Sequence, residues 1–182
     1  MTNRTFNDDG ILVGPRLTRP AIARELERMR SVRLQLVEAH PFWGHLLLHV
    51  RLVPALELDA VAATDCVRHI WFNPRFSRHL CLAQLAFVLC HEVGHLLLAT
   101  APRQRGRDPY LWNCATDYAI NRVVFEMALK TRPTGSIQLP NGTYPDLGEL
   151  QVLLDKRFAG MPAEAIYEHL LAERDDAGKD SP

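Results

Sequence analysis

Residues 80–99, LCLAQLAFVLCHEVGHLLLA, are the most apolar stretch of the chain and predict a buried helix. The stretch contains the motif H-E-x-x-H at His91, Glu92 and His95. Because His91 and His95 are one helical turn apart, both imidazoles leave the same face and can bind one metal ion. A helix this apolar must offset the burial of three polar side chains, and metal coordination is the usual way to do so. The sequence therefore predicts a metal centre on a buried helix.

Zn²⁺ is the ion that this donor set favours, because neutral imidazoles together with an oxygen ligand suit it. Glu92 directly follows the first ligand, so its carboxylate can reach a metal-activated water and accept its proton as general base. The bare motif also arises by chance. In that alternative, His91 and His95 are core histidines hydrogen-bonded to the backbone, and Glu92 is an exposed helix residue. The spacing of the trio within so apolar a helix favours metal binding.

A catalytic zinc ion typically has three protein ligands and a water, so a third ligand must come from elsewhere in the chain. Thr100 lies nine residues after His91. On a straight helix with about 100° per residue, that separation puts it on the opposite face. We therefore expect Thr100 not to assist the site.

A second predicted helix, residues 110–130, carries a polar stripe in which Asn113, Asp117 and Asn121 recur every four residues. A carboxylate at the centre of such a stripe needs a partner, so we predict Asp117 as the third ligand. Asn113 and Asn121 would orient the ligands through hydrogen bonds. Asn113 as an oxygen ligand is the first alternative. The second is a solvated helix face with Asp117 exposed.

The other histidines show no ligand spacing relative to the motif, and we interpret them as structural; they are His40, His45, His49, His69, His79 and His169. His45 and His49 are four residues apart, but they fall in a strand-like run, where that spacing separates two side chains too far for one ion.

The cysteines contain no C-x-x-C pair and are expected to be small buried side chains in a reducing compartment; they are Cys66, Cys81, Cys90 and Cys114. A thiolate ligand from Cys90 or Cys114 is left open.

Composition bounds the class of protein. With 182 residues, 47% of them hydrophobic and 23% charged, the chain fits one globular domain. Zero net charge and a pI of about 7.1 give no electrostatic basis for binding nucleic acid or an anionic membrane. Residues 1–10 lack the apolar core of a secretory signal, so we expect a cytoplasmic protein. We predict a polar N-terminal segment (1–18), one domain (19–174) and a disordered tail (175–182).

Periodicity, proline and glycine predict the elements around the metal helix. Helices are expected over residues 19–39, 110–130, 150–158 and 162–173, strands over 46–53, 58–63 and 66–72, and a loop over 131–148. Asn73–Pro74 and Asp108–Pro109 each combine a cap residue with proline and open a helix. The basic run Arg103, Arg105 and Arg107 is expected in a solvated loop. The predicted fold class is α+β, with a small mixed sheet packed on the buried H-E-x-x-H helix and a second, ligand-bearing helix.

The segments HEVGH (91–95) and WNCATDYAIN (112–121), with Arg103 between them, resemble the bacterial putative metallopeptidase domain that is often fused to a von Willebrand factor A-like domain. The resemblance extends to PFWG (41–44), Asn73–Pro74 and GMPAEAIY (160–167), so it covers most of the chain. It implies a zincin-like fold and peptidase activity.

Two features differ from that family. Thr100 stands where members often have a third histidine. The chain also ends after the metallopeptidase-like part, so we expect the role of the von Willebrand-type module to be absent or supplied by a separate regulatory protein.

The leading hypothesis is a zinc-dependent metallopeptidase acting on a protein or peptide substrate, with zinc on His91, His95 and Asp117 and with Glu92 as base. A strand such as residues 69–72 is expected to form the cleft edge, where an extended peptide adds main-chain hydrogen bonds. The residue that stabilises the oxyanion stays open among Tyr110, Tyr118 and Tyr144. The alternative function is a catalytically silent, zinc-stabilised protein-interaction module. Glu92 favours the enzyme, because a structural zinc needs no base.

Overall fold

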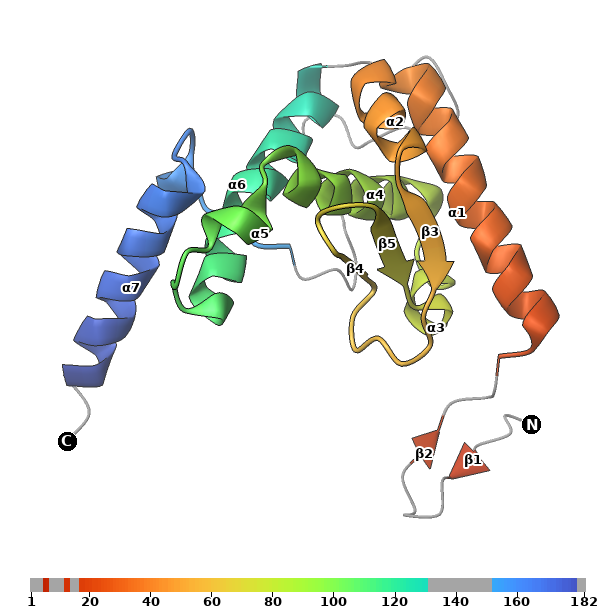
Figure 1. Ribbon diagram of the computed structural model, residues 1–182, viewed down its shortest axis with the longest axis horizontal. Helices are drawn as coiled ribbons and strands as arrows, with labels where there is room; N and C mark the ends of the chain where they lie inside the picture. Colours follow the sequence, from red (N-terminus) through yellow and green to blue (C-terminus); the bar gives the residue numbers. More distant parts are fainter. Residues whose placement is uncertain (1–4, 7–11, 14–16, 131–151, 180–182) are drawn as a thin grey trace.

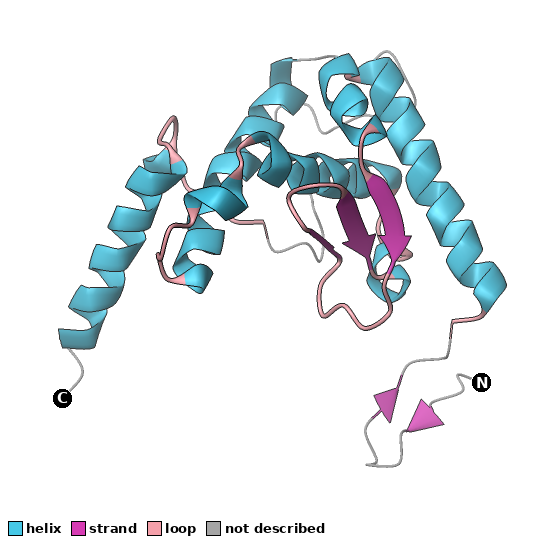
Figure 2. Cartoon of the chain, in the orientation of Figure 1, coloured by secondary structure: helices cyan, strands magenta, loops and turns pink. Residues whose placement is uncertain are grey.

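Three helices and a small sheet position the site in the computed structural model, which describes residues 5–6, 12–13, 17–130 and 152–179 (Figures 1 and 2). The elements are β1 (Thr5–Phe6), β2 (Leu12–Val13), α1 (Arg19–Ala39), α2 (Pro41–Leu48), β3 (Arg51–Pro54), β4 (Ala62–Thr64), β5 (His69–Phe72), α3 (Pro74–Ser77), α4 (Leu82–Leu97), α5 (Thr100–Arg103), α6 (Pro109–Lys130), the 3₁₀ turn η1 (Lys156–Phe158) and α7 (Ala163–Lys179). Helix dominates and the sheet is small and mixed, which confirms the predicted α+β class.

Helices α1 and α2 form an antiparallel pair on one side of the molecule (Figure 1). The predicted strand over residues 46–53 is wrong in its first half, since Pro41 opens α2 and only Arg51–Pro54 is extended. A short apolar run does not distinguish a buried helix from a strand, and here the helix places Trp43 and Leu47 in the core. Gly44 permits the close packing: a Cβ there would lie within 2.7 Å of the carbonyl carbon of Leu36 in α1.

The three-stranded sheet has the order β3–β5–β4. Strand β5 pairs in parallel with β3, where Leu52 faces Ile70, and antiparallel with β4, where Ala63 faces Trp71. Residues 69–72 therefore form the central strand. The prediction that they line the cleft edge is wrong, because both sides of β5 are already paired. Among the described residues, β4 is the edge strand on the side of the metal helix.

Helix α4 is the centre of the fold and packs against β4, α1, α2 and α6. Its residues Leu85, Leu89 and Val93 belong to the main core, which the sheet and α1 complete. Gly94 lets α6 approach, because a Cβ at this position would lie 2.6 Å from Cγ2 of Ile120. None of the described helices combines the length and apolarity needed to span a bilayer.

Helix α7 packs on the far side of α6 over a second, smaller apolar cluster (Figure 1). It extends to Lys179, past residue 174, where we expected a disordered tail to begin. The predicted helix over 150–158 is reduced to the turn η1. The loop predicted over 131–148 and residues 180–182 lie outside the described residues.

Candidate metal centre

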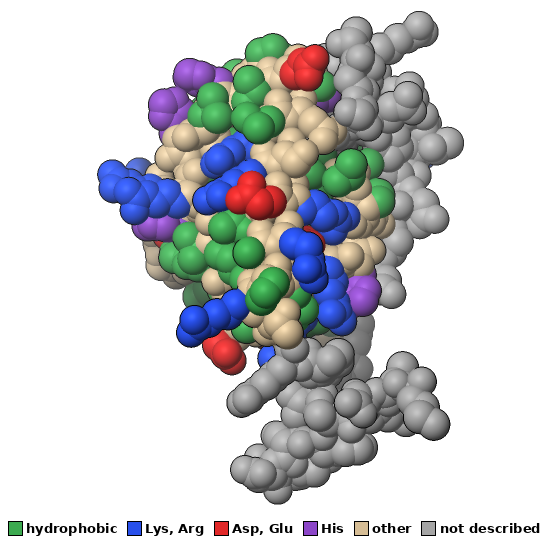
Figure 3. All heavy atoms as spheres, turned by 90° about the vertical axis from the view of Figure 1, so that its right-hand side faces the viewer, with side chains coloured by type: hydrophobic (Ala, Val, Ile, Leu, Met, Phe, Trp, Pro, Cys, Tyr) green, Lys and Arg blue, Asp and Glu red, His purple; other side chains and the backbone are tan. Residues whose placement is uncertain are grey.

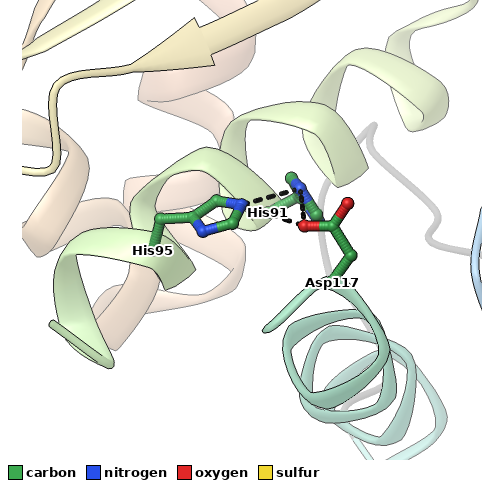
Figure 4. Close-up of side chains that lie close together, drawn as sticks. All are labelled: His91, His95 and Asp117. Carbon is green, nitrogen blue, oxygen red and sulfur yellow. Dashed lines mark hydrogen bonds and ion pairs between the residues drawn. The ribbon is translucent and has the colours of Figure 1, made fainter. Parts of the chain in front are cut away.

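Three potential ligands converge where α4 and α6 cross. Figure 4 shows the imidazoles of His91 and His95, both from α4, pointing toward the carboxylate of Asp117 from α6. The two Nε2 atoms lie 3.1 Å apart, and Oδ1 of Asp117 lies 3.3 Å from Nε2 of His95 and 3.6 Å from Nε2 of His91. Donor atoms arranged tetrahedrally around a zinc ion at about 2.0–2.1 Å are about 3.3 Å apart. The donor spacing therefore fits one such ion.

A hydrogen bond fixes the orientation of the first imidazole. Nδ1 of His91 lies 2.7 Å from Oδ1 of Asn121, whose amide nitrogen donates to the carbonyl of Leu153 at 3.1 Å. An amide oxygen only accepts, so Nδ1 of His91 must carry the proton. The neutral ring then has its lone pair on Nε2, which faces Asp117. This is the orienting role predicted for Asn121.

The second imidazole has a partner that the sequence argument excluded. Oγ1 of Thr100 lies 3.1 Å from Nδ1 of His95, and Thr100 is buried. Helix α4 ends at Leu97, and Ala99 adopts the left-handed conformation with φ of 48°, so the chain turns before Thr100 opens α5. Our assumption of a straight helix was wrong. The nearby Pro102 is the sequence signal that could have indicated the break.

The carboxylate of Asp117 has one satisfied oxygen and one unsatisfied oxygen. Oδ2 accepts a hydrogen bond from the amide of Asn113 at 3.1 Å. Oδ1 is buried and accepts no hydrogen bond from the described residues. A buried anionic oxygen without a donor is costly, and a cation between it and the two imidazoles removes that cost. The donor set thus fits a metal ion, with Asn113 orienting the carboxylate.

Burial shifts the pKa values of His91 and Glu92. Loss of solvation is the main effect on His91 and lowers its pKa, which favours the neutral imidazole that a metal requires. Burial likewise raises the pKa of Glu92 to about 7; the neighbouring His95 opposes this shift and Asp117 adds to it. A carboxyl with such a pKa can both accept and release a proton near neutral pH.

Two adjoining cavities open on the metal centre. The larger, of about 490 Å³, is lined by strand β4 together with His91, Glu92, His95 and Asp117. The smaller, of about 260 Å³, shares His91, Glu92 and Asp117 but is otherwise mostly apolar; that part of its lining includes Val61, Phe87, Val88, Val152 and Leu153. The candidate centre therefore lies where two hollows meet, and the smaller one is mostly apolar away from the centre.

The remaining candidates are not among the clustered ligands. Within the described residues, only His91, His95 and Asp117 form a group of three or more candidate metal ligands, so neither Cys90 nor Cys114 joins them. Of the four cysteines only Cys90 is buried, whereas we expected all of them to be; Cys66 lines the larger cavity, with its sulfur 3.6 Å from Oγ1 of Thr100.

The basic run and the tyrosines also have structural positions. We expected Arg103 to be solvated, but it pairs with Glu164 of α7 at 2.6 Å. Arg107 stacks on Trp112. Tyr110 and Tyr118 line neither of the two cavities, and Tyr144 lies outside the described residues.

Comparison with known proteins gives two matches. A family described as "Putative metallopeptidase domain" matches residues 25–181. A Thermotoga maritima protein described as uncharacterized is 27% identical over 161 residues, which is 84% of this chain. The chain spans only 40% of the length of that relative. No solved structure matches the chain.

Proposed function

Since this chain belongs to the putative metallopeptidase domain family, we propose that it is a zinc-dependent peptidase in which His91, His95 and Asp117 hold the ion and Glu92 is the general base. The observation that carries the proposal is the buried Oδ1 of Asp117, which has no hydrogen-bond donor and faces two imidazole nitrogens. We favour zinc because two neutral imidazoles and one carboxylate suit it best.

A bound zinc ion would polarise the scissile carbonyl and make the attacking water more acidic. The work of the protein is to hold and move the proton. Glu92 is buried, lines both cavities and has a raised pKa, so its carboxylate is suited to accept the proton of the water and pass it to the leaving amine.

We propose that a peptide substrate lies extended along β4. This strand lines the larger cavity and is paired on only one side among the described residues, so its free edge can form main-chain hydrogen bonds with a peptide. The apolar hollow beside the metal centre would accept one apolar side chain of the substrate, with Phe87 and Val88 as part of its wall. This places the cleft edge at β4 in place of β5.

The alternative, a zinc-stabilised interaction module without catalysis, predicts no need for Glu92. Burying the carboxyl group of Glu92 costs free energy, and only the enzyme hypothesis gives this group a role that explains its buried position. The enzyme is therefore the better account of this residue.

The deciding experiment is Glu92→Gln. An amide cannot accept the proton of the water, so the variant should retain the metal and the fold but lose at least about 100-fold in hydrolysis rate. Elemental analysis, circular dichroism and a mass-spectrometric screen of a peptide library would measure the three properties. Glu57→Gln, at an exposed position between β3 and β4, is the matched control. Cleavage at equal rates by wild type and Glu92→Gln would refute the mechanism. If neither cleaves any peptide, the interaction module is favoured.

A further inference from the structure

A second pair of histidines lies on α2, away from the metal centre. His45 and His49 are both exposed, and their Nε2 atoms are 3.3 Å apart. Their ring centroids are separated by 4.9 Å with an interplanar angle of 75°. The corresponding values for His91 and His95 are 3.1 Å, 4.8 Å and 81°. The two pairs thus have nearly the same geometry.

This geometry arises because residues 41–48 are helical and not extended. Leu48 is the last residue of α2, and His49 caps the helix in the right-handed conformation, so His45 and His49 are one turn apart on one face. We expected a strand there and judged the pair too far apart for one ion, which is wrong. Their nitrogens now lie at about the 3.3 Å spacing of two donors around a tetrahedral ion. The negative end of the helix dipole at this terminus also favours a cation.

We propose that His45 and His49 form a second binding site for a first-row transition-metal ion of the Ni²⁺, Cu²⁺ or Zn²⁺ class. Imidazole suits all three ions. Among the described residues, no third His, Cys, Asp or Glu ligand atom joins the pair, so water completes the coordination and binding is weaker than at the three-ligand centre.

The surface around the pair is open to an ion. Figure 3 shows the face that includes α1, where histidine side chains gather near one edge beside hydrophobic ones. Phe42, on the same face of α2 as His45, is 58% exposed. Without a metal, the Nε2–H of one ring donates to the lone pair of the other. Metal binding replaces that bond with a lone pair from each ring, and it does not depend on peptidase activity.

Calorimetric titration of the metal-free protein with NiCl₂ tests the proposal. Wild type should bind about two equivalents, the second at least about tenfold more weakly. His45→Ala/His49→Ala should bind only the tighter equivalent, with its affinity unchanged within about twofold. His91→Ala/His95→Ala should keep only the weaker one.

The control is His169→Ala, which removes an exposed histidine that has no histidine partner at a ring-nitrogen distance among the described residues; it should still bind two equivalents. Binding of a single equivalent by wild type overturns the proposal, as does a second equivalent that survives in His45→Ala/His49→Ala. Both altered positions are exposed, so this variant should fold. If His91→Ala/His95→Ala does not fold, the comparison of the other three proteins decides.

Discussion

Each proposed ligand of the metal centre is oriented by a separate polar partner. Asn121 contacts His91, Thr100 contacts His95, and Asn113 contacts Asp117. These contacts involve Nδ1 of each histidine and Oδ2 of Asp117. The second donor atom of each side chain, Nε2 or Oδ1, then points toward the common centre. The arrangement separates the residues that would bind the ion from those that would only position them, and the two classes should respond differently to substitution.

Asp117→Ala should weaken zinc binding more strongly than Asn113→Ala. The first removes a ligand, whereas the second removes only the donor to Oδ2 and should cost about 10–100-fold in affinity. Competition with a chromophoric chelator measures both. Equal zinc affinities for Asp117→Ala and wild type would show that the third ligand is another residue. A larger loss of affinity in Asn113→Ala would favour Asn113 as that ligand.

Thr100→Val should reduce zinc affinity by about tenfold, because the isosteric side chain lacks the hydroxyl that holds Nδ1 of His95. Thr100→Ser keeps the hydroxyl and should bind zinc like wild type. A general loss of stability would affect the thermal midpoint of both variants, so the affinity difference between Val and Ser isolates the hydrogen bond. If the two variants bind zinc equally, Thr100 does not position His95.

At the scale of single residues, the sequence predicted those members of the candidate site whose position depends only on local helical spacing. His91, Glu92 and His95 follow from one helical period, and Asp117 follows from the stripe with Asn113 and Asn121. Thr100 could not be placed in the same way, since its position depends on the left-handed backbone at Ala99. A single such residue redirects the chain without a hydrophobic pattern to indicate it.

Between elements, the distance from α4 to α6 determines whether the ligands can meet. Gly94→Ala should push α6 away, because its Cβ would lie 2.6 Å from Cγ2 of Ile120. We expect a loss of about 1–3 kcal/mol in stability together with weaker zinc binding. Thermal unfolding of the metal-free protein and chelator competition would measure the two effects.

Ile120→Ala provides the control in a double-mutant cycle. On its own it should destabilise the core, but combined with Gly94→Ala it should cost less than the sum of the two, since it removes the clashing atoms. Additive losses would show that the two helices do not meet at this contact.

The turn between β4 and β5 gives a pH-dependent contribution to stability. Burial raises the pKa of Asp65, but hydrogen bonds from the backbone of His69, Arg68 and Val67 and from the His69 ring outweigh it and hold the pKa well below the ordinary value. A group with a lowered folded pKa stabilises the fold above its unfolded pKa, about 3.9, and loses that contribution as the pH falls toward the folded pKa.

Asp65→Asn should therefore cost about 1–2 kcal/mol at pH 7, and the difference from wild type should shrink as the pH falls below about 4. Urea unfolding of the metal-free proteins at pH 7 and at several pH values from about 4 down to about 2 measures the difference. Asp59→Asn, at an exposed position of the preceding loop, should have little effect at any pH. A difference that is constant with pH would mean that the charge of Asp65 contributes nothing.

Elements with strong periodicity were predicted well, and short apolar ones were not. The helix expected over 19–39 coincides with α1. The helix expected over 110–130 matches α6, which begins one residue earlier, at Pro109. The run from residue 46 was assigned to a strand because its apolar residues fit either a buried strand or a buried helix. Packing against α1, which Gly44 makes possible, decides for the helix, and such long-range contacts leave no local signal.

At the scale of the molecule, two apolar clusters differ in how they are supported. The main core joins α1, α2, α4, α6 and the sheet, whereas the second cluster joins α7 to the outer side of α6. The candidate metal centre lies at α4 and α6, on the side of the main core. Resemblance in sequence to the metallopeptidase family led to the function proposed for this site, but not to the division into clusters.

This division predicts unequal local stability. Helix α7 is held mainly by α6 and by ion pairs such as Arg103–Glu164, whose side chains are 31% and 38% exposed and which therefore contribute little. Its backbone amides should exchange with solvent deuterium well before those of α4, because α7 can separate without disrupting the main core.

Ile166→Ala, which removes fully buried contacts of the second cluster, should cost about 2–4 kcal/mol in stability and accelerate exchange in α7. Zinc affinity should change little in this variant, in contrast to Gly94→Ala. Hydrogen exchange read by mass spectrometry would reject the division if α4 and α7 exchange together in both proteins.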